Sequence, residues 1–163
     1  MRNRIEFFLD GAETERYHTI RTLQRETVGH HSHGVAMFVV LMQGSAMALR
    51  AALFHDLAEH ILGDIPSPAK KKYGIGEQVN ELEEQLLDGM DFNVELDARS
   101  KRILKFADIF QGMSFCTREV KMGNTKLASV FYRYKTYAEE LMPCGVEREI
   151  FDALLETWNE RGQ

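Results

Sequence analysis

The pair His55-Asp56 lies inside an otherwise apolar stretch, in the order Leu-Phe-His-Asp-Leu-Ala-Glu-His from residue 53 to residue 60. An adjacent imidazole and carboxylate can both bind one divalent cation. Burying them without a counter-ion would be costly, so the pair is a candidate metal centre. Glu59 follows His55 by four residues and Asp56 by three, which places it on the same side of a helix. A carboxylate there could hold or deprotonate a water at the metal.

A second histidine offers a third ligand. His31 is followed by Val35, Phe38 and Met42, so helical spacing places it on an apolar helix face. A lone histidine on such a face is more often a satisfied core residue than a ligand. The sequence therefore makes His31 a metal candidate only together with other ligands.

Asp108 offers a fourth ligand. It shares a helical stripe with Leu104, Gln111 and Phe115, and a carboxylate on a core-facing stripe is rare unless it is paired or metal-bound. It could instead pair with Lys105 or Arg102. Two nitrogens and two oxygens would suit Mn²⁺, Co²⁺, Zn²⁺ or Fe²⁺ better than Ca²⁺, and Mg²⁺ also stays among the candidate ions.

The order His31 … His55-Asp56 … Asp108 resembles the signature of HD-domain metal-dependent phosphohydrolases. Residues 27–37, 54–70 and 104–108 resemble more closely the small branch of 5′-deoxynucleotidase-like enzymes, which includes phage deoxyadenosine triphosphate triphosphohydrolases. The resemblance extends over about residues 13–118.

The resemblance implies a role for each matching residue. By this resemblance, the metal would be bound by His31, His55, Asp56 and Asp108. Glu59 would activate water, and Asp64 would have a second catalytic or sugar-contacting role. Arg16 and Lys70 would bind phosphate. Tyr17 stands where the family usually has tryptophan, and we expect it to stack on a base or sugar. His30 stands where the family often has glutamate. Taken singly, Arg16 could be a plain exposed arginine, Lys70 part of a solvated lysine run and Asp64 a turn residue.

Composition narrows the class of protein. The 163 residues are enough for one domain, so we expect a single domain over 1–163. The net charge of −5 gives no general basic field for nucleic acid. Two cysteines, Cys116 and Cys144, form no metal-type spacing, which favours a reduced, cytoplasmic setting. No apolar run is long enough to cross a bilayer, so we expect no membrane partner.

The elements that must position these residues are all expected to be helices. Few prolines and no long period-2 alternation predict an all-α, bundle-like HD-type domain. The expected helices cover about 28–42, 45–62, 76–90, 96–122, 125–142 and 146–161. Ser45 is the expected N-cap and Gly63 the expected stop of the second of these, and residues 63–68 are expected to form an ordered turn.

The sequence thus predicts a metal-dependent phosphohydrolase of 2′-deoxynucleotides. Three consecutive lysines and the short chain favour release of triphosphate from a deoxynucleoside triphosphate such as dATP. Removal of phosphate from deoxynucleoside monophosphates is the alternative, and a non-catalytic HD nucleotide-binding module is a rival of another class. By family analogy we expect a homo-oligomer. The apolar residues compatible with its interface are Met113, Phe115, Val130, Phe131 and Tyr134.

Overall fold

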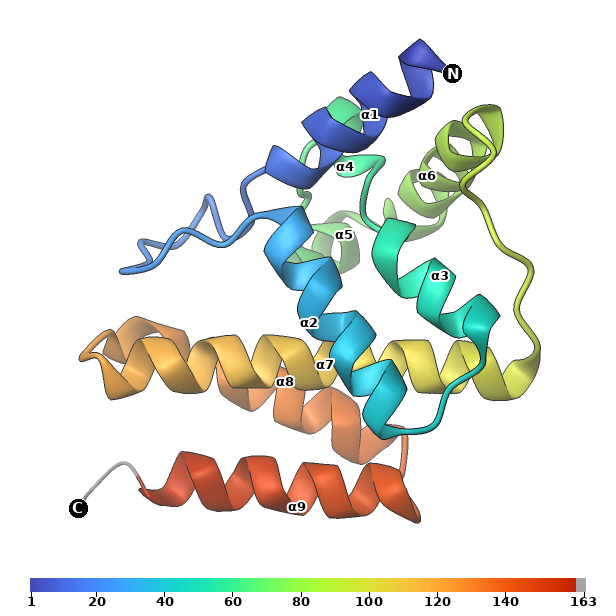
Figure 1. The fold of residues 1–163 in the computed structure, drawn as a ribbon. Coiled ribbons are helices and arrows are strands. Elements are labelled where there is room, and N and C mark those ends of the chain that lie inside the picture. The colour runs from blue at the N-terminus through green and yellow to red at the C-terminus, as the bar shows by residue number, and fades with distance from the viewer. Residues whose placement is uncertain (161–163) are drawn as a thin grey trace.

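The computed structural model describes residues 1–160, which form an all-α domain (Figure 1). In chain order its helices are α1 (Arg2–Glu13), α2 (Val28–Leu41), α3 (Ala46–Phe54), α4 (Glu59–Leu62), α5 (Ser67–Tyr73), α6 (Gly76–Gly89), α7 (Ala98–Lys121), the 3₁₀ helix η1 (Thr125–Leu127), α8 (Ala128–Glu140) and α9 (Val146–Asn159). The expected all-α class is confirmed. Within the described residues, no helix is both long and apolar enough to cross a membrane.

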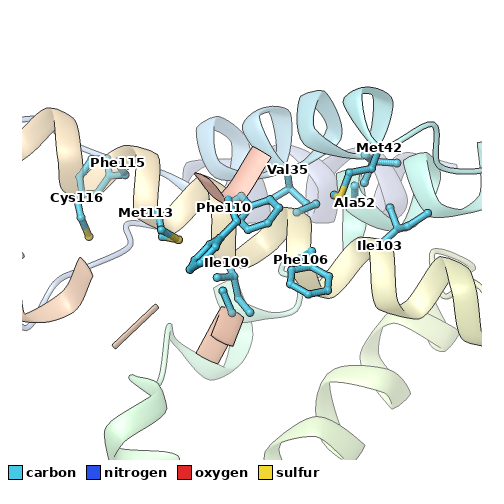
Figure 2. Packing of buried hydrophobic residues seen from close by; sticks show 14 of the residues in the cluster. Val35, Met42, Ala52, Ile103, Phe106, Ile109, Phe110, Met113, Phe115 and Cys116 are labelled. Carbon is cyan, nitrogen blue, oxygen red and sulfur yellow. The ribbon is translucent and has the colours of Figure 1, made fainter. Parts of the chain in front are cut away.

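Helix α7 is the axis of the domain. Helices α2 and α3 pack on it from one side, and α8 and α9 pack on it from another (Figure 1). Its side chains are buried on several faces, and Phe106, Ile109, Phe110 and Met113 form the centre of the main core (Figure 2). A helix held from several sides in this way is a rigid support for Asp108, which it carries.

Polar caps set the starts of three helices that position the site. Thr27 accepts a hydrogen bond from the His30 amide at the start of α2, and Ser45 accepts one from the Ala48 amide at the start of α3. Asp97 does the same for Ser100 at the start of α7. These side chains satisfy amides that lack a helical partner, which stabilises a helix by about 1 kcal/mol each. The expected cap at Ser45 is therefore confirmed.

The prediction of one helix over residues 45–62 is wrong, because the structure has two helices there, α3 and α4. Helix α3 ends at Phe54, and the next residues form tighter i→i−3 hydrogen bonds, from the Leu57 amide to the Phe54 carbonyl (3.1 Å) and from Glu59 to Asp56 (3.0 Å). The imidazole of His55 bonds the Ala52 carbonyl at 3.0 Å, and so competes with the backbone for it. The chain then forms the short helix α4. As expected, Gly63 ends this helix, with a positive φ of 80°.

Two further expectations need correction. Residues 67–73 form helix α5 directly after Pro66, so the three lysines lie on a helix rather than after a turn. The helix expected from 125 begins with a turn of 3₁₀ helix. Helix α9 ends at Asn159, and the expected end at 161 lies outside the described residues.

The apolar residues assigned to a possible interface are mostly core residues of the single chain. Met113, Phe115, Val130 and Phe131 are all at most 4% exposed, and Tyr134 packs against the same cluster. They pack between α7, α8 and their neighbours because the C-terminal helices cover that side of α7 (Figure 1). This interface assignment is therefore wrong.

The helix α1, which the sequence analysis did not predict, covers the break that carries His55 and Asp56. Phe7 on α1 is buried in a second small cluster with Val28 and Leu57. A Cβ at Gly11 would lie 2.9 Å from the Leu57 side chain and carbonyl. The close contact explains a glycine here, and it fixes the turn from one side.

Candidate metal centre

Residues from two separate segments meet at one point. His31 comes from the first turns of α2, and His55 and Asp56 come from the break after α3. His31 Nε2 lies 3.4 Å from Asp56 Oδ2, and His55 Nε2 lies 3.4 Å from Asp56 Oδ1. One donor atom of each residue lies within 4.8 Å of the other two, so the three could hold a metal ion.

Asp108 lies against this group from α7. Its Oδ1 is 3.4 Å from His31 Nε2, while its Oδ2 accepts a hydrogen bond from Lys105 at 3.2 Å. It therefore adjoins the three-residue group without belonging to it. The expected pair with Lys105 is therefore confirmed, whereas Arg102, the other expected partner, bonds Glu147 at 2.6 Å instead. The metal-binding role of Asp108 stays a prediction.

The imidazoles of both histidines are oriented with Nε2 toward the centre. His31 Nδ1 lies 2.6 Å from Gln111 Oε1, and His55 Nδ1 lies 3.0 Å from the Ala52 carbonyl. Each Nδ1 therefore faces an acceptor and donates to it, so in the neutral form of each ring the lone pair lies on Nε2. Both Nε2 atoms are buried, and neither has a hydrogen-bond partner among the described residues. This is the tautomer and orientation that a metal-binding histidine needs.

Gln111 and Glu26 support His31 and were not assigned to the site from the sequence. The amide nitrogen of Gln111 donates to Glu26 Oε1 at 2.7 Å, which turns the amide oxygen toward His31. Both residues are buried. The position of Gln111 three residues after Asp108 was a usable signal, whereas nothing in the local pattern around Glu26 marked it.

The charges at the centre suit metal binding. Burial lowers the pKa of His55, which favours its neutral form. Burial alone would raise the pKa of Asp56, but His55, Arg16 and His31 outweigh it and keep that pKa below its ordinary value. For Asp108, too, burial is outweighed, by Lys105 and His31, and its pKa lies well below the usual range. Neutral imidazoles beside ionised carboxylates are the forms that bind metals.

Glu59 has the opposite tendency. It is buried at the start of α4, and burial together with the charge of Asp56 raises its pKa to about 10. Its Oε2 has no hydrogen-bond partner among the described residues and lies 3.9 Å from Arg16 Nη1. A dication nearby would favour the carboxylate and lower this pKa again.

Arg16 lies directly against the centre. Its Nη1 donates to Asp56 Oδ2, and its Nε lies 4.0 Å from Glu26 Oε2. Its side chain is only 10% exposed, and Nε has no hydrogen-bond partner within residues 1–160. The resemblance implied a phosphate-binding role for Arg16, but its burial and its direct contact with the Asp56 carboxylate were not predicted.

Tyr17 and Asp64 are joined on one side of the centre. The Tyr17 amide donates to Asp64 Oδ2 at 3.2 Å, and Tyr17 takes a positive φ of 58°, unusual for a residue with a side chain. Its ring stacks on Phe115 at 4.8 Å, and its hydroxyl lies 3.1 Å from that of Tyr134. One ring face is therefore already covered, and stacking on a substrate through Tyr17 stays a prediction.

Lys70 is paired with a carboxylate of a neighbouring helix. Its ammonium pairs with Glu83 on α6 at 3.0 Å. Glu83 is close enough to Glu59 for its charge to add to the raised pKa of Glu59. The phosphate-binding role of Lys70 therefore stays a prediction. A hollow of about 230 Å³ lies next to the centre, with His55, Glu83 and Leu104 in its wall.

In this helical domain, a histidine-aspartate pair at a helix break meets a histidine and an aspartate from two other helices. This arrangement is that of a metal-binding domain of the HD type. The family model for the HD domain matches residues 13–144, and the chain belongs to this family. No curated protein gives a significant match.

Solved structures support the same fold. The PH0347 protein from Pyrococcus horikoshii OT3 is similar with a TM-score of 0.68 at 19% identity, over 98% of this chain and 99% of that one. The HD phosphohydrolase DatZ of cyanophage S-2L, bound to dA and one catalytic Zn²⁺ ion, is similar with a TM-score of 0.60 at 18% identity, over 95% of this chain and 94% of that one.

The contact between Gln111 and His31 gives a first prediction. We expect Gln111→Ala to weaken Mn²⁺ or Zn²⁺ binding by about 10–100-fold, because His31 loses the partner that fixes its tautomer. Titration of the purified protein with each ion measures the change. Ser114→Ala, which removes a hydroxyl bonded to the Phe110 carbonyl on the same helix, is the control and should leave affinity unchanged. Equal affinities in the two variants would contradict the supporting role of Gln111.

Proposed function

We propose that this protein is a divalent-metal-dependent phosphohydrolase acting on 2′-deoxynucleotides. The observation that carries the proposal is the pair of buried, unpartnered Nε2 atoms of His31 and His55, both facing the carboxylate of Asp56. The similar cyanophage phosphohydrolase, which is bound to dA and a catalytic Zn²⁺ ion, supports this class of substrate and cofactor.

The ion would be held by His31, His55 and Asp56, with Asp108 beside them as the fourth candidate. When bound, it supplies positive charge that polarises a phosphate oxygen and lowers the pKa of water. Asp56 and Asp108 are suited to hold it because the pKa of each lies below its ordinary value. His55 is suited because burial keeps it neutral.

Glu59 is the proposed proton acceptor for the attacking water. It follows Asp56 by three residues, and its unpartnered Oε2 is buried beside Arg16. A carboxylate in such a place can orient water and take its proton, which is worth about 10²–10⁴-fold in rate. Asp64 is proposed to have a second catalytic or sugar-contacting role. Its carboxylate accepts a hydrogen bond from the amide of Tyr17, the residue proposed to stack on the base or sugar.

Arg16 is the proposed phosphate-binding residue. Its guanidinium is buried at the centre, and its Nε is a donor with no partner among the described residues. Planar, forked donors of this kind match phosphate oxygens well. Lys70 would add charge at the edge of the site once a phosphate competes with Glu83 for its ammonium.

For the substrate we propose a deoxynucleoside triphosphate such as dATP, with triphosphate as the leaving product. The resemblance to phage triphosphohydrolases and the three lysines gathered on α5 support this choice. Removal of one phosphate from deoxynucleoside monophosphates is the alternative. We also propose a cytoplasmic homo-oligomer, for which the exposed apolar side chains of Met37, Val40 and Leu41 on α2 offer a surface.

A panel of nucleotides tests the proposed function. We expect Mn²⁺-, Co²⁺- or Zn²⁺-dependent hydrolysis of deoxynucleoside triphosphates, faster than that of the matching ribonucleotides, with separate assays for orthophosphate and tripolyphosphate. Orthophosphate from monophosphates alone would select the alternative. Hydrolysis of ribonucleotides at equal rates would contradict the sugar preference.

The rival of another class is a non-catalytic module that binds a nucleotide. Such a module would need the ligands but not a buried carboxylate beside them, and Glu59 is therefore the residue that separates the two. Nucleotide binding with full metal content and no product with any member of the panel would select the rival.

A further inference from the structure

Arg16 and Tyr17 belong to the connection between α1 and α2, residues 14–27, which forms no regular helix. Its two ends are joined by backbone hydrogen bonds, from Arg16 to the Glu26 carbonyl (2.9 Å) and from Val28 to the Thr14 carbonyl (2.8 Å). These bonds fix the base of the connection but not its far part, residues 18–24.

Glu119 holds the far part of the connection. Its carboxylate accepts hydrogen bonds from the Leu23 and Gln24 amides, both at 2.8 Å, and from the Asn124 amide nitrogen at 2.7 Å. Asn124 also donates to the Arg21 carbonyl at 2.9 Å. Glu119 is fully buried near the C-terminal end of α7, so both of its oxygens are partnered away from water. Hydrogen bonds to a buried carboxylate are among the stronger ones in proteins.

Glu119 cannot touch the reacting atoms itself. It lies eleven residues after Asp108 on the same helix, which corresponds to about 16 Å along the helix axis. Its link to the centre runs through the connection, whose other end places Arg16 against Asp56 and the Tyr17 amide against Asp64. The same helix α7 therefore carries Asp108, Gln111 and the anchor of the connection.

We propose that Glu119 is a positioning residue for the phosphate site: by clamping residues 21–24 onto α7 it holds Arg16 and Tyr17 where a phosphate and a sugar would bind. This inference rests on the proposed function, because it uses Arg16 as a phosphate-binding residue. The position requires an acceptor at both side-chain oxygens. A glutamine of the same size would turn an N–H₂ group against the N–H donors of Leu23, Gln24 or Asn124.

The test uses Glu119→Gln and inorganic tripolyphosphate as the probe. In the full-length protein with Mn²⁺ we expect the variant to bind tripolyphosphate about 10-fold more weakly, equivalent to about 1.4 kcal/mol. Metal affinity should stay unchanged. Hydrogen exchange of the Leu23 or Gln24 amide should become faster, because the two amides donate to different oxygens of Glu119 and a glutamine keeps only one of them.

A double-mutant cycle separates positioning from general stability. If Glu119 acts through Arg16, the double variant Glu119→Gln with Arg16→Ala should bind tripolyphosphate no more weakly than Arg16→Ala alone. Glu147→Gln is the matched control, because Glu147 is also a buried carboxylate but bonds Arg102 at 2.6 Å, away from the connection. It should leave tripolyphosphate binding unchanged in both backgrounds.

Two results would overturn the inference: unchanged exchange of Leu23 and Gln24, or losses of affinity that add fully in the double variant. If the wild type binds no tripolyphosphate, the role of Arg16 is wrong and the inference fails with it. If the wild type binds tripolyphosphate but hydrolyses no nucleotide, only the proposed function fails. The double-mutant cycle then still tests whether Glu119 positions Arg16.

Discussion

Glu59→Gln is expected to reduce deoxynucleotide hydrolysis by about 10²–10⁴-fold while the protein keeps its metal. Glutamine has the size of the buried glutamate but cannot take a proton from water. The surroundings already favour a neutral group, since burial and the charge of Asp56 raise the pKa of Glu59 to about 10. The fold should therefore be retained, and a steady-state assay beside metal analysis measures the two effects separately.

The control for this variant is Glu81→Gln, which neutralises an exposed carboxylate on α6. It should hydrolyse substrate at the wild-type rate. Glu59→Gln with full metal content and wild-type activity would show that another group accepts the proton, or that the ion alone suffices. Loss of metal together with loss of activity would instead make Glu59 part of the metal site.

The sequence predicted the helices well where amphipathic patterns and caps agree. Ser45 was the predicted cap of α3, and Thr27 and Asp97 cap α2 and α7 in the same way although they were not predicted. Such bonds join residues three positions apart, so they are visible in the sequence. The gathering of His31, His55 and Asp56 was predicted because their order in the sequence resembles the HD-domain signature.

The break after Phe54 could not be predicted in the same way. Neither glycine nor proline interrupts residues 53–62, and the apolar pattern continues through them. At the break, the His55 ring bonds the Ala52 carbonyl. Asp56 forms an ion pair with Arg16, which belongs to a distant segment of the sequence. Tertiary contacts therefore overrule the local preference for one long helix.

The supporting residues were missed for a related reason. Gln111 bonds Glu26 across 85 positions of sequence, and Glu119 bonds Leu23 across 96. Buried polar side chains of this kind look like ordinary surface residues of a helix or a loop when read one at a time. Only the packing of the 14–27 connection on α7 reveals that each one has a partner.

His55→Ala is expected to abolish stoichiometric binding of Mn²⁺ or Zn²⁺, with affinity falling by more than the 10–100-fold typical of a lost supporting contact. It removes one of the two lone pairs that face Asp56 and leaves His31 alone with the carboxylates. Hydrolysis should be lost with the metal. Elemental analysis after incubation with excess ion and gel filtration measures the content directly.

His60→Ala is a close control because His60 also has a buried ring nitrogen without a partner within residues 1–160. Its ring, however, packs edge-on against Phe7 at 4.8 Å and belongs to no metal-binding group. A ligand that binds only the folded state at 100 times its Kd stabilises the protein by about 2.7 kcal/mol. Added metal should therefore raise the Tm of the wild type and His60→Ala but not that of His55→Ala. A wild type that gains neither metal nor stability would contradict the metal centre and leave Arg16 and Lys105 as the cations that balance Asp56 and Asp108.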